Sequence, residues 1–167
     1  MKNQSKVFVI FLLLIFMASC NNNPCPEPEA HAKEIIDKEQ LKAEIEELFV
    51  KTQSLMSEND VEGLVQRFTA DGKLKLPQSP LIQGHDALRE NYKTTTQLED
   101  FKIDIKTLDV EISEAGDMAS VVGEFTVSFN TPQGTVQDNG VTLLTLKRID
   151  NSWKIAAEVL SSMPQDM

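Results

Sequence analysis

The sequence contains 167 residues, with 26 acidic and 16 basic side chains, and its formal net charge is −10. A chain of this length suits one domain with a short extension. Because an acidic chain repels phosphate backbones and anionic lipid headgroups, we expect no nucleic-acid partner and interpret the acidity as solvated surface.

Residues 1–19 have the parts of a bacterial secretory signal. Lys2 and Lys6 provide a positive region, and residues 7–17 form an uncharged apolar run that is too short to span a bilayer of about 30 Å as a helix. The run leads into the tetrapeptide MASC, which resembles the bacterial lipobox and ends at Cys20. The resemblance implies lipidation of Cys20. The alternative is an ordinary cleaved signal peptide with a chance cysteine.

Lipidation of Cys20 by more than one acyl chain would anchor the mature protein to a membrane. The rest of the chain would then lie in the cell envelope, outside the cytoplasm. Asn21 follows the cysteine where an aspartate is associated with inner-membrane retention, which favours the outer membrane. Cleavage after residue 19 removes two lysines and moves the net charge from −10 to −12.

Residues 20–36 predict a flexible tether, because three alternating prolines favour extended polyproline geometry. Cys25 is the one thiol left free beside a lipidated Cys20, so no intrachain disulfide is expected. We interpret Cys25 as a passive surface thiol, with pairing to another chain as the alternative. His31 has no nearby second ligand, and we expect neither a metal site nor a cofactor.

The next segment predicts two helices that follow one another directly. Asp37 has the spacing of a capping-box residue, and apolar residues then recur at helical spacing as far as Asn59. Asp60 can cap a short second helix whose inner face extends to Phe68. The residues Ala70-Asp71-Gly72 are expected to break it.

A short strand and a third helix complete the first half of the domain. Residues 73–76 alternate as a strand does and are stopped by Pro77, and a loop rich in proline and serine follows. The third helix is expected from His85 to Lys93, with Leu88 and Tyr92 four residues apart on one face.

The C-terminal part predicts a run of four longer strands separated by short turns, so that neighbours pair antiparallel. In the first of them the apolar alternation shifts by one residue, which predicts a β-bulge near Lys106–Thr107. We expect an α+β domain over residues 37–162 with a strongly curved antiparallel sheet, followed by a tail at 163–167. The four strands are expected at 101–112, 118–129, 135–149 and 152–161.

This order of elements resembles the nuclear transport factor 2-like superfamily, with its ketosteroid isomerase-like and SnoaL-like branches closest. The resemblance covers residues 37–162. It implies a cone-shaped sheet wrapped around the long N-terminal helix, a pocket at the open end, and dimerisation through the outer sheet face. It rests on the helix break at Asn59-Asp60, FTAD at 68–71, IQG at 82–84 and WKI at 153–155.

The sequence departs from the best-known chemistries of this superfamily. The isomerases place an aspartate base directly before the proline that ends the short strand, and that position here is Leu76. No tyrosine stands between Asp37 and Asn59, where the isomerases carry an oxyanion donor. The dehydratases use paired histidines, whereas the mature chain has only His31 in the tether and His85 at a helix start.

Five residues are candidates for lining the pocket, and most have a structural alternative. Tyr92 could equally cap the core, Asp138 could belong to an edge bulge because its neighbours have high turn propensity, and Trp153 could be a core plug. Glu158 could point into the pocket with a raised pKa or face solvent on an alternating strand. The fifth candidate is Leu76.

Arg67 is expected to pair with Asp71 in a structural role. The features together favour a lipid-anchored, non-catalytic module that binds a small apolar or amphipathic ligand or a protein partner, including a second copy of itself. The alternative is an enzyme that transfers a proton with a carboxylate such as Glu158 or Asp138. A folded spacer at the envelope is the third possibility.

Overall fold

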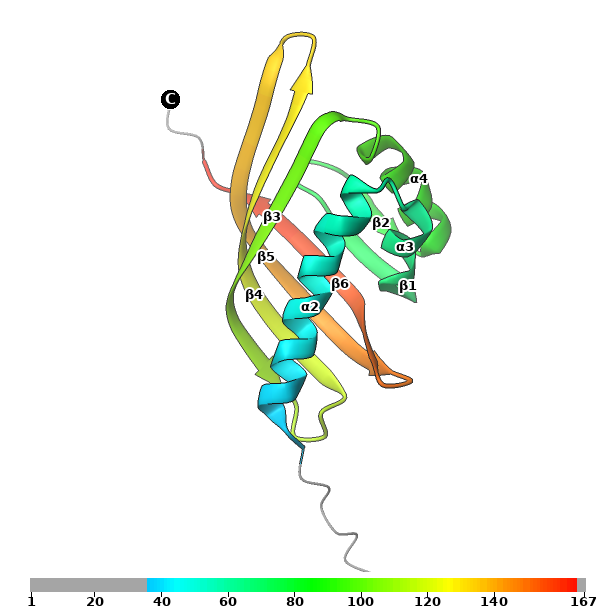
Figure 1. Cartoon of the computed structure of the whole chain (residues 1–167), viewed down its shortest axis with the longest axis vertical. Helices are drawn as coiled ribbons and strands as arrows, with labels where there is room; N and C mark the ends of the chain where they lie inside the picture. The colour runs from blue at the N-terminus through cyan, green and yellow to red at the C-terminus, as the bar shows by residue number, and fades with distance from the viewer. Residues whose placement is uncertain (1–35, 165–167) are drawn as a thin grey trace, which may run out of the picture. The chain divides into compact units, whose positions relative to one another are not determined.

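The computed structural model describes residues 36–164, which form one compact unit. The predicted signal peptide, Cys20 and nearly all of the predicted tether lie outside the described residues. Within them, a six-stranded sheet is flanked by one long helix and two short ones (Figure 1). This is a mixed α+β architecture, as the order of elements predicts.

The long helix α2, Lys38–Ser57, begins where its capping residue predicts. Asp37 accepts hydrogen bonds from the backbone N–H groups of Glu39 and Gln40, both at 3.1 Å. Gln40 does not complete a capping box, because its side chain donates to Glu44 at 3.1 Å instead. The predicted apolar stripe is buried against β3 and β6 of the sheet, through Leu41, Ile45, Phe49, Thr52 and Leu55.

Two short helices, α3 (Val61–Gln66) and α4 (His85–Thr95), pack against each other, and α4 also contacts β1 and β2. Asp60 caps α3 as predicted, accepting from the N–H of Gly63 at 2.8 Å. Helix α3 ends before Phe68, which begins a strand. The predicted helical role of Phe68 is therefore wrong, although its side chain is buried.

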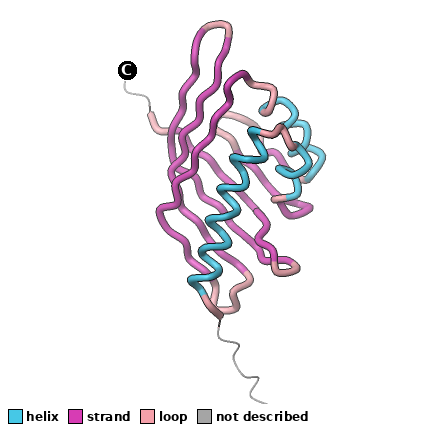
Figure 2. The backbone as a smooth tube through the Cα atoms, in the orientation of Figure 1, coloured by secondary structure: helices cyan, strands magenta, loops and turns pink. Residues whose placement is uncertain are grey.

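The sheet is curved and does not close into a barrel (Figure 2). Its order is β2-β1-β6-β5-β4-β3, and every pair is antiparallel except β1 with β6. The four predicted long strands are confirmed. The strands are β1 Phe68–Lys75, β2 Leu81–Gln83, β3 Glu99–Ile112, β4 Met118–Thr131, β5 Gly134–Ile149 and β6 Ser152–Ser162.

The first two strands differ from the prediction. The segment Ala70–Gly72 does not separate a helix from a strand but forms an irregular part of β1, where the pairing with β6 shifts. Strand β2 follows a Pro/Ser-rich loop and has only three residues, so it carries no alternation that a sequence pattern could detect. It exists because it pairs with the outer half of β1.

Two β-bulges decide which side chains face the helices. In β3 the register to β4 shifts between Thr107 and Asp109, which leaves Leu108 as the extra residue, next to the predicted position. In β6 the pairing passes from Ile155 to Ala157 across one step of β5, so Ala156 is the extra residue. Each extra residue reverses the face of all later side chains in its strand.

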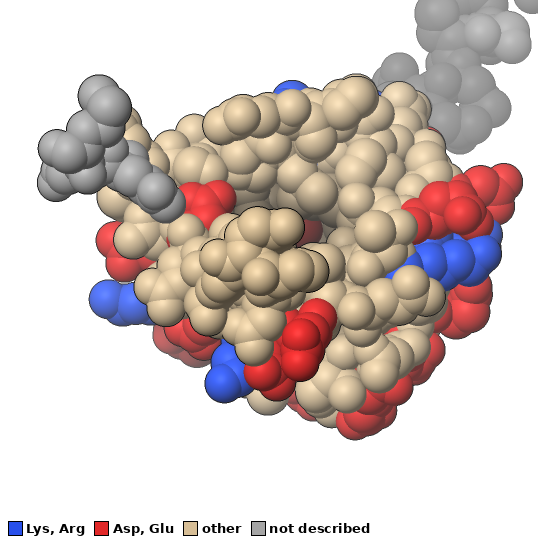
Figure 3. Space-filling model, turned by 90° about the horizontal axis from the view of Figure 1, so that it is seen from above, with Lys and Arg blue, Asp and Glu red and all other residues tan. Residues whose placement is uncertain are grey.

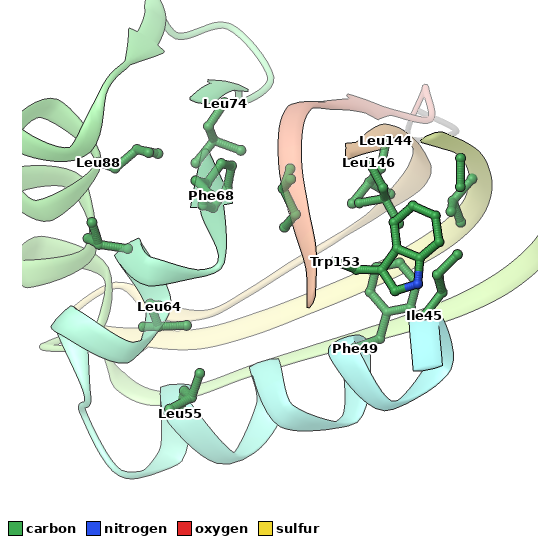
Figure 4. Close-up of a cluster of buried hydrophobic side chains, with 14 of the residues drawn as sticks. Ile45, Phe49, Leu55, Leu64, Phe68, Leu74, Leu88, Leu144, Leu146 and Trp153 are labelled. Carbon is green, nitrogen blue, oxygen red and sulfur yellow. The ribbon is translucent and has the colours of Figure 1, made fainter. Parts of the chain in front are cut away.

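The core lies between the helices and the inner face of the sheet, and it includes Leu64 of α3 and Leu88 of α4 (Figure 4). The inner face of β4 is occupied as the alternation predicts, with Ala119, Val121, Gly123 and Phe125 buried. None of the described helices is long and apolar enough to cross a membrane.

The outer face of the central strands carries an apolar row. Val122, Leu143 and Val159 are direct neighbours across β4, β5 and β6, and they are 38 %, 51 % and 44 % exposed. Dimerisation through this face stays a prediction.

We expect Leu146→Ala to lower the free energy of unfolding by about 2–5 kcal/mol, because Leu146 is fully buried in the core. Leu108→Ala, at the bulge of β3 where the side chain is 51 % exposed, removes the same atoms and should cost less than about 1 kcal/mol. Urea unfolding measures both. Equal losses would contradict the assignment of inner and outer positions.

Candidate functional site: a small apolar cavity with buried polar side chains

A cavity of about 230 Å³ lies between the inner face of the sheet, α2, α4 and the turn that joins α3 to β1. In Figure 3 the molecule is hollowed near its middle, and most atoms around the hollow belong to uncharged residues. The wall is mainly apolar. Its apolar residues include Met56, Leu74, Leu76, Leu98, Phe101, Ile103, Ile105, Phe125, Val127, Phe129 and Leu160.

Glu158 reaches this cavity because of the bulge in β6. Before the bulge Trp153 and Ile155 point inward, and after Ala156 the inward positions are Glu158 and Leu160. The cross-strand neighbours of Glu158 are Leu74 on β1 and Leu144 on β5, and both are buried. A carboxyl group thus occupies an inward position between two leucines, and it is only 7 % exposed.

The environment of Glu158 favours its protonated form. Burial raises the pKa of the Glu158 carboxyl, and the positive charge of Arg67 opposes that shift only in part. No described side chain forms a hydrogen bond or ion pair with the carboxyl. Hydrogen-bonding capacity is therefore free for a bound molecule.

Arg67 is the residue that joins α3 to β1. Its carbonyl accepts a hydrogen bond from the N–H of Ile155 at 2.8 Å, which fixes the turn to β6 three residues before Glu158. The side chain lines the cavity and is only 6 % exposed. Its Nε has no hydrogen-bond partner among the described residues, and burial lowers the pKa of the guanidinium.

Tyr92 comes from α4, where it lies one turn after the buried Leu88. Its ring packs against Phe68, with the ring centroids 6.4 Å apart. The residue is 5 % exposed and lines the cavity, and burial raises the pKa of its phenol. Tyr92 therefore stays neutral at ordinary pH and offers a hydroxyl that can donate or accept.

Four of the five predicted pocket residues line this one cavity, namely Leu76, Tyr92, Asp138 and Glu158. Trp153 does not. It is buried in the core, where it lies with Ile45 and Phe49 of α2 (Figure 4), because it precedes the bulge. The indole of Trp153 therefore fills space in the core, which is the structural alternative given for this residue in the sequence analysis.

Asp138 occupies a regular position in β5 opposite Val127, so the predicted alternative of an edge bulge at this point is wrong. Its carboxylate accepts a hydrogen bond from the hydroxyl of Ser162 at 2.6 Å. The residue also borders a second, open groove of about 1,020 Å³ between the end of α2 and the β3–β5 strands. Asp138 thus lies where the small cavity meets the groove.

The predicted pair between Arg67 and Asp71 does not form. Asp71 is exposed and accepts from the hydroxyl of Thr69 at 3.0 Å, which lowers the pKa of its carboxyl. The sequence carries no clear signal for the burial of Arg67, because it follows the polar Gln66 at the end of a short helix. Among the described residues no cluster of acidic, histidine or cysteine side chains could hold a metal ion.

The family model of the SnoaL-like domain matches residues 45–166. The chain belongs to the SnoaL-like domain family. No curated protein matches the chain.

Solved structures share the fold of this SnoaL-like domain. A protein of unknown function from Mycobacterium tuberculosis is 24 % identical with a TM-score of 0.66, covering 80 % of this chain and 79 % of that one. A ketosteroid isomerase-like protein from Erwinia carotovora atroseptica is 21 % identical with a TM-score of 0.62, covering 74 % and 96 %.

A candidate scytalone dehydratase from Novosphingobium aromaticivorans is 16 % identical with a TM-score of 0.65, covering 76 % of this chain and 87 % of that one. At these identities the similarity shows the fold alone, and function has to be argued from the cavity.

The position of Glu158 predicts how stability depends on pH. Its folded-state pKa lies above the ordinary 4.5, so between the two values the folded state holds the proton that the unfolded state has lost. Glu158 therefore reduces the free energy of unfolding as pH rises through this window. We expect the gain in stability from Glu158→Gln, relative to the natural protein, to grow between about pH 4 and pH 7.

Urea unfolding across this pH range measures the effect. Glu124→Gln removes an exposed carboxylate on the outer face of β4 and is the matched control, which should follow the natural protein. A Glu158→Gln difference that stays constant with pH would contradict the buried carboxyl.

Proposed function

We propose that this SnoaL-like domain is a non-catalytic binding module, in which α2 and the sheet form a cone that holds a small amphipathic ligand. The observation that carries the proposal is the set of three buried side chains, Arg67, Tyr92 and Glu158, whose polar groups line one apolar cavity, whereas the buried hydroxyl of Thr52 there already donates to the carbonyl of Leu48. Buried polar groups in folded proteins normally have partners. A ligand with a polar head and an apolar body would supply the missing ones.

The volume of the cavity limits the size of the buried part of the ligand. An engineered cavity of about 150 Å³ takes benzene, so at the same ratio 230 Å³ takes about nine non-hydrogen atoms. This corresponds to one ring with a short substituent. Larger ligands would have to extend past Asp138 into the open groove.

Leu76 supports binding over the familiar isomerase chemistry. It lines the cavity at the position before Pro77 where the resemblance implies the catalytic aspartate, and a leucine cannot carry a proton. Its hydrocarbon side chain instead extends the apolar wall.

Proton transfer by Glu158 is the second candidate function. Its support is the raised pKa of a carboxyl that lines a cavity, a feature common among general acids and bases. The two functions differ in the fate of the ligand, because a binding module releases it chemically unchanged. Conversion of a bound compound that slows about 10²–10⁴-fold in Glu158→Gln would favour the enzyme.

We expect Val127→Trp to abolish ligand binding, because the added indole would occupy much of a cavity of about 230 Å³ that Val127 lines. Thermal shift against a panel of single-ring amphipathic compounds, followed by calorimetry, measures binding. Leu81→Trp, at an exposed position on the edge strand β2, is the matched control and should bind as the natural protein does. Equal ligand shifts in both variants would place the site elsewhere.

We also propose that the domain is lipid-anchored in the envelope through Cys20, with the outer membrane as its location. The support is the apolar run ending in MASC. Cys20→Ala should move the protein from the membrane fraction to the soluble fraction and abolish labelling by a radioactive fatty acid. Cys25→Ala is the control within the same segment and should leave both unchanged. Labelling that survives in Cys20→Ala would refute the anchor.

A further inference from the structure

Resting on the proposed function, we propose that the ligand of the small cavity is an ionised carboxylic acid, whose carboxylate is held between Arg67 and Glu158. The head group of this ligand would meet three side chains, which come from the α3–β1 turn, α4 and β6.

Arg67 supplies the positive charge. It is the only lysine or arginine among the described residues that line the cavity, and no described carboxylate forms an ion pair with it. The side chain is more than nine-tenths buried and its Nε lacks a partner. The planar guanidinium matches the two oxygens of a carboxylate, which can accept two parallel hydrogen bonds from it.

Glu158 supplies a proton donor beside that charge. Two carboxyl groups in one desolvated site cannot both stay ionised, and they share one proton. With the ligand bound, the positive Arg67 faces a single negative charge that Glu158 and the ligand carboxyl share. If Glu158 is ionised in the ligand-free protein, ligand binding is accompanied by the uptake of one proton from solvent onto a carboxylate oxygen of Glu158. No other covalent bond forms or breaks.

The other groups around Glu158 are consistent with this arrangement. Tyr92 faces it from α4 and adds a neutral hydroxyl, and Arg67 faces it from the α3–β1 turn. Asp138 on β5 lines the same cavity, but its carboxylate already accepts from Ser162. The positions that α2, β3 and β4 contribute carry no titratable side chain.

An anionic head group fits these residues better than a cationic one. An ammonium ion beside Glu158 would also lie in the field of Arg67, and the two positive charges would repel each other in a poorly hydrated site. It would leave the buried Nε of Arg67 without an acceptor. A carboxylate accepts from Arg67, Tyr92 and protonated Glu158 together.

The test compares four ligands of matched size on the full chain: benzoate, benzamide, benzyl alcohol and benzylamine. Calorimetric titration is carried out above about pH 5.5, where a free carboxylic acid is ionised. We expect benzoate to bind at least about 10-fold more tightly than either neutral compound, and benzylamine most weakly. Benzoate affinity should fall as pH rises, because Glu158 then loses its proton.

Two variants separate the role of Arg67 from the role of Glu158. Arg67→Gln should weaken benzoate binding about 10- to 100-fold while benzyl alcohol still binds, which also shows that the cavity is intact. Glu158→Gln should keep benzoate binding, because the Gln amide donates in place of the acid, but abolish its pH dependence. Arg89→Gln is the matched control, since Arg89 pairs with Glu62 and Asp86 away from the cavity.

The outcomes distinguish the two proposals. If the neutral compounds bind as tightly as benzoate, or benzylamine binds best, the carboxylate is refuted and ligand binding stands. If none of the four binds, ligand binding in this cavity fails and the carboxylate fails with it. If Arg67→Gln does not fold, the pH profiles of the natural protein and Glu158→Gln decide, and equal profiles overturn the inference.

Discussion

The candidate site depends on one extra residue in strand β6. Ala156 forms a bulge against β5, and without it Glu158 would continue the outward phase of the strand and lie in solvent. With it, the carboxyl is buried between Leu74 and Leu144 on the inner face. Desolvating a carboxyl is unfavourable, so this arrangement reduces stability at neutral pH, as is common at functional sites.

Arg67 is the natural counterpart of that carboxyl, yet the two do not form an ion pair within the protein. In a buried ion pair in direct contact, the two side chains would satisfy each other's charges and hydrogen bonds. Few hydrogen-bonding groups would then remain for a polar ligand. Here the guanidinium, the carboxyl and the phenol of Tyr92 line the same small space. The charges of Arg67 and Glu158 interact without direct contact, and the hydrogen-bonding groups of both side chains remain free for a ligand.

The SnoaL-like fold supplies the scaffold for this arrangement without determining the chemistry. Helix α2 covers the inner face of the sheet, and α3 and α4 lie beside its β1–β2 end (Figure 1). The cavity lies between α2, α4, the α3–β1 turn and the inner face of the sheet. Leu76 stands where the superfamily resemblance implies a catalytic aspartate, and the buried carboxyl of this cavity comes instead from Glu158 on β6, the strand paired with β1.

The sequence by itself determined the three helices and the four long strands, because their signals are local. Asp37 and Asp60 mark helix starts, alternation marks the four long strands, and a shift in that alternation marks the bulge in β3. The sequence also indicated Leu76, Tyr92, Asp138 and Glu158 as candidates for lining a pocket, and in the structure all four line one cavity.

Only the tertiary structure decided the bulge in β6, the existence of β2 and the burial of Arg67. The small residues around Ala156 carry no apolar alternation to reveal a slip, so the bulge in β6 and the inward direction of Glu158 depend on pairing with β5. Strand β2 exists only through its partner β1. The burial of Arg67 likewise depends on residues distant in sequence, because the turn that carries it is fixed by Ile155 on β6.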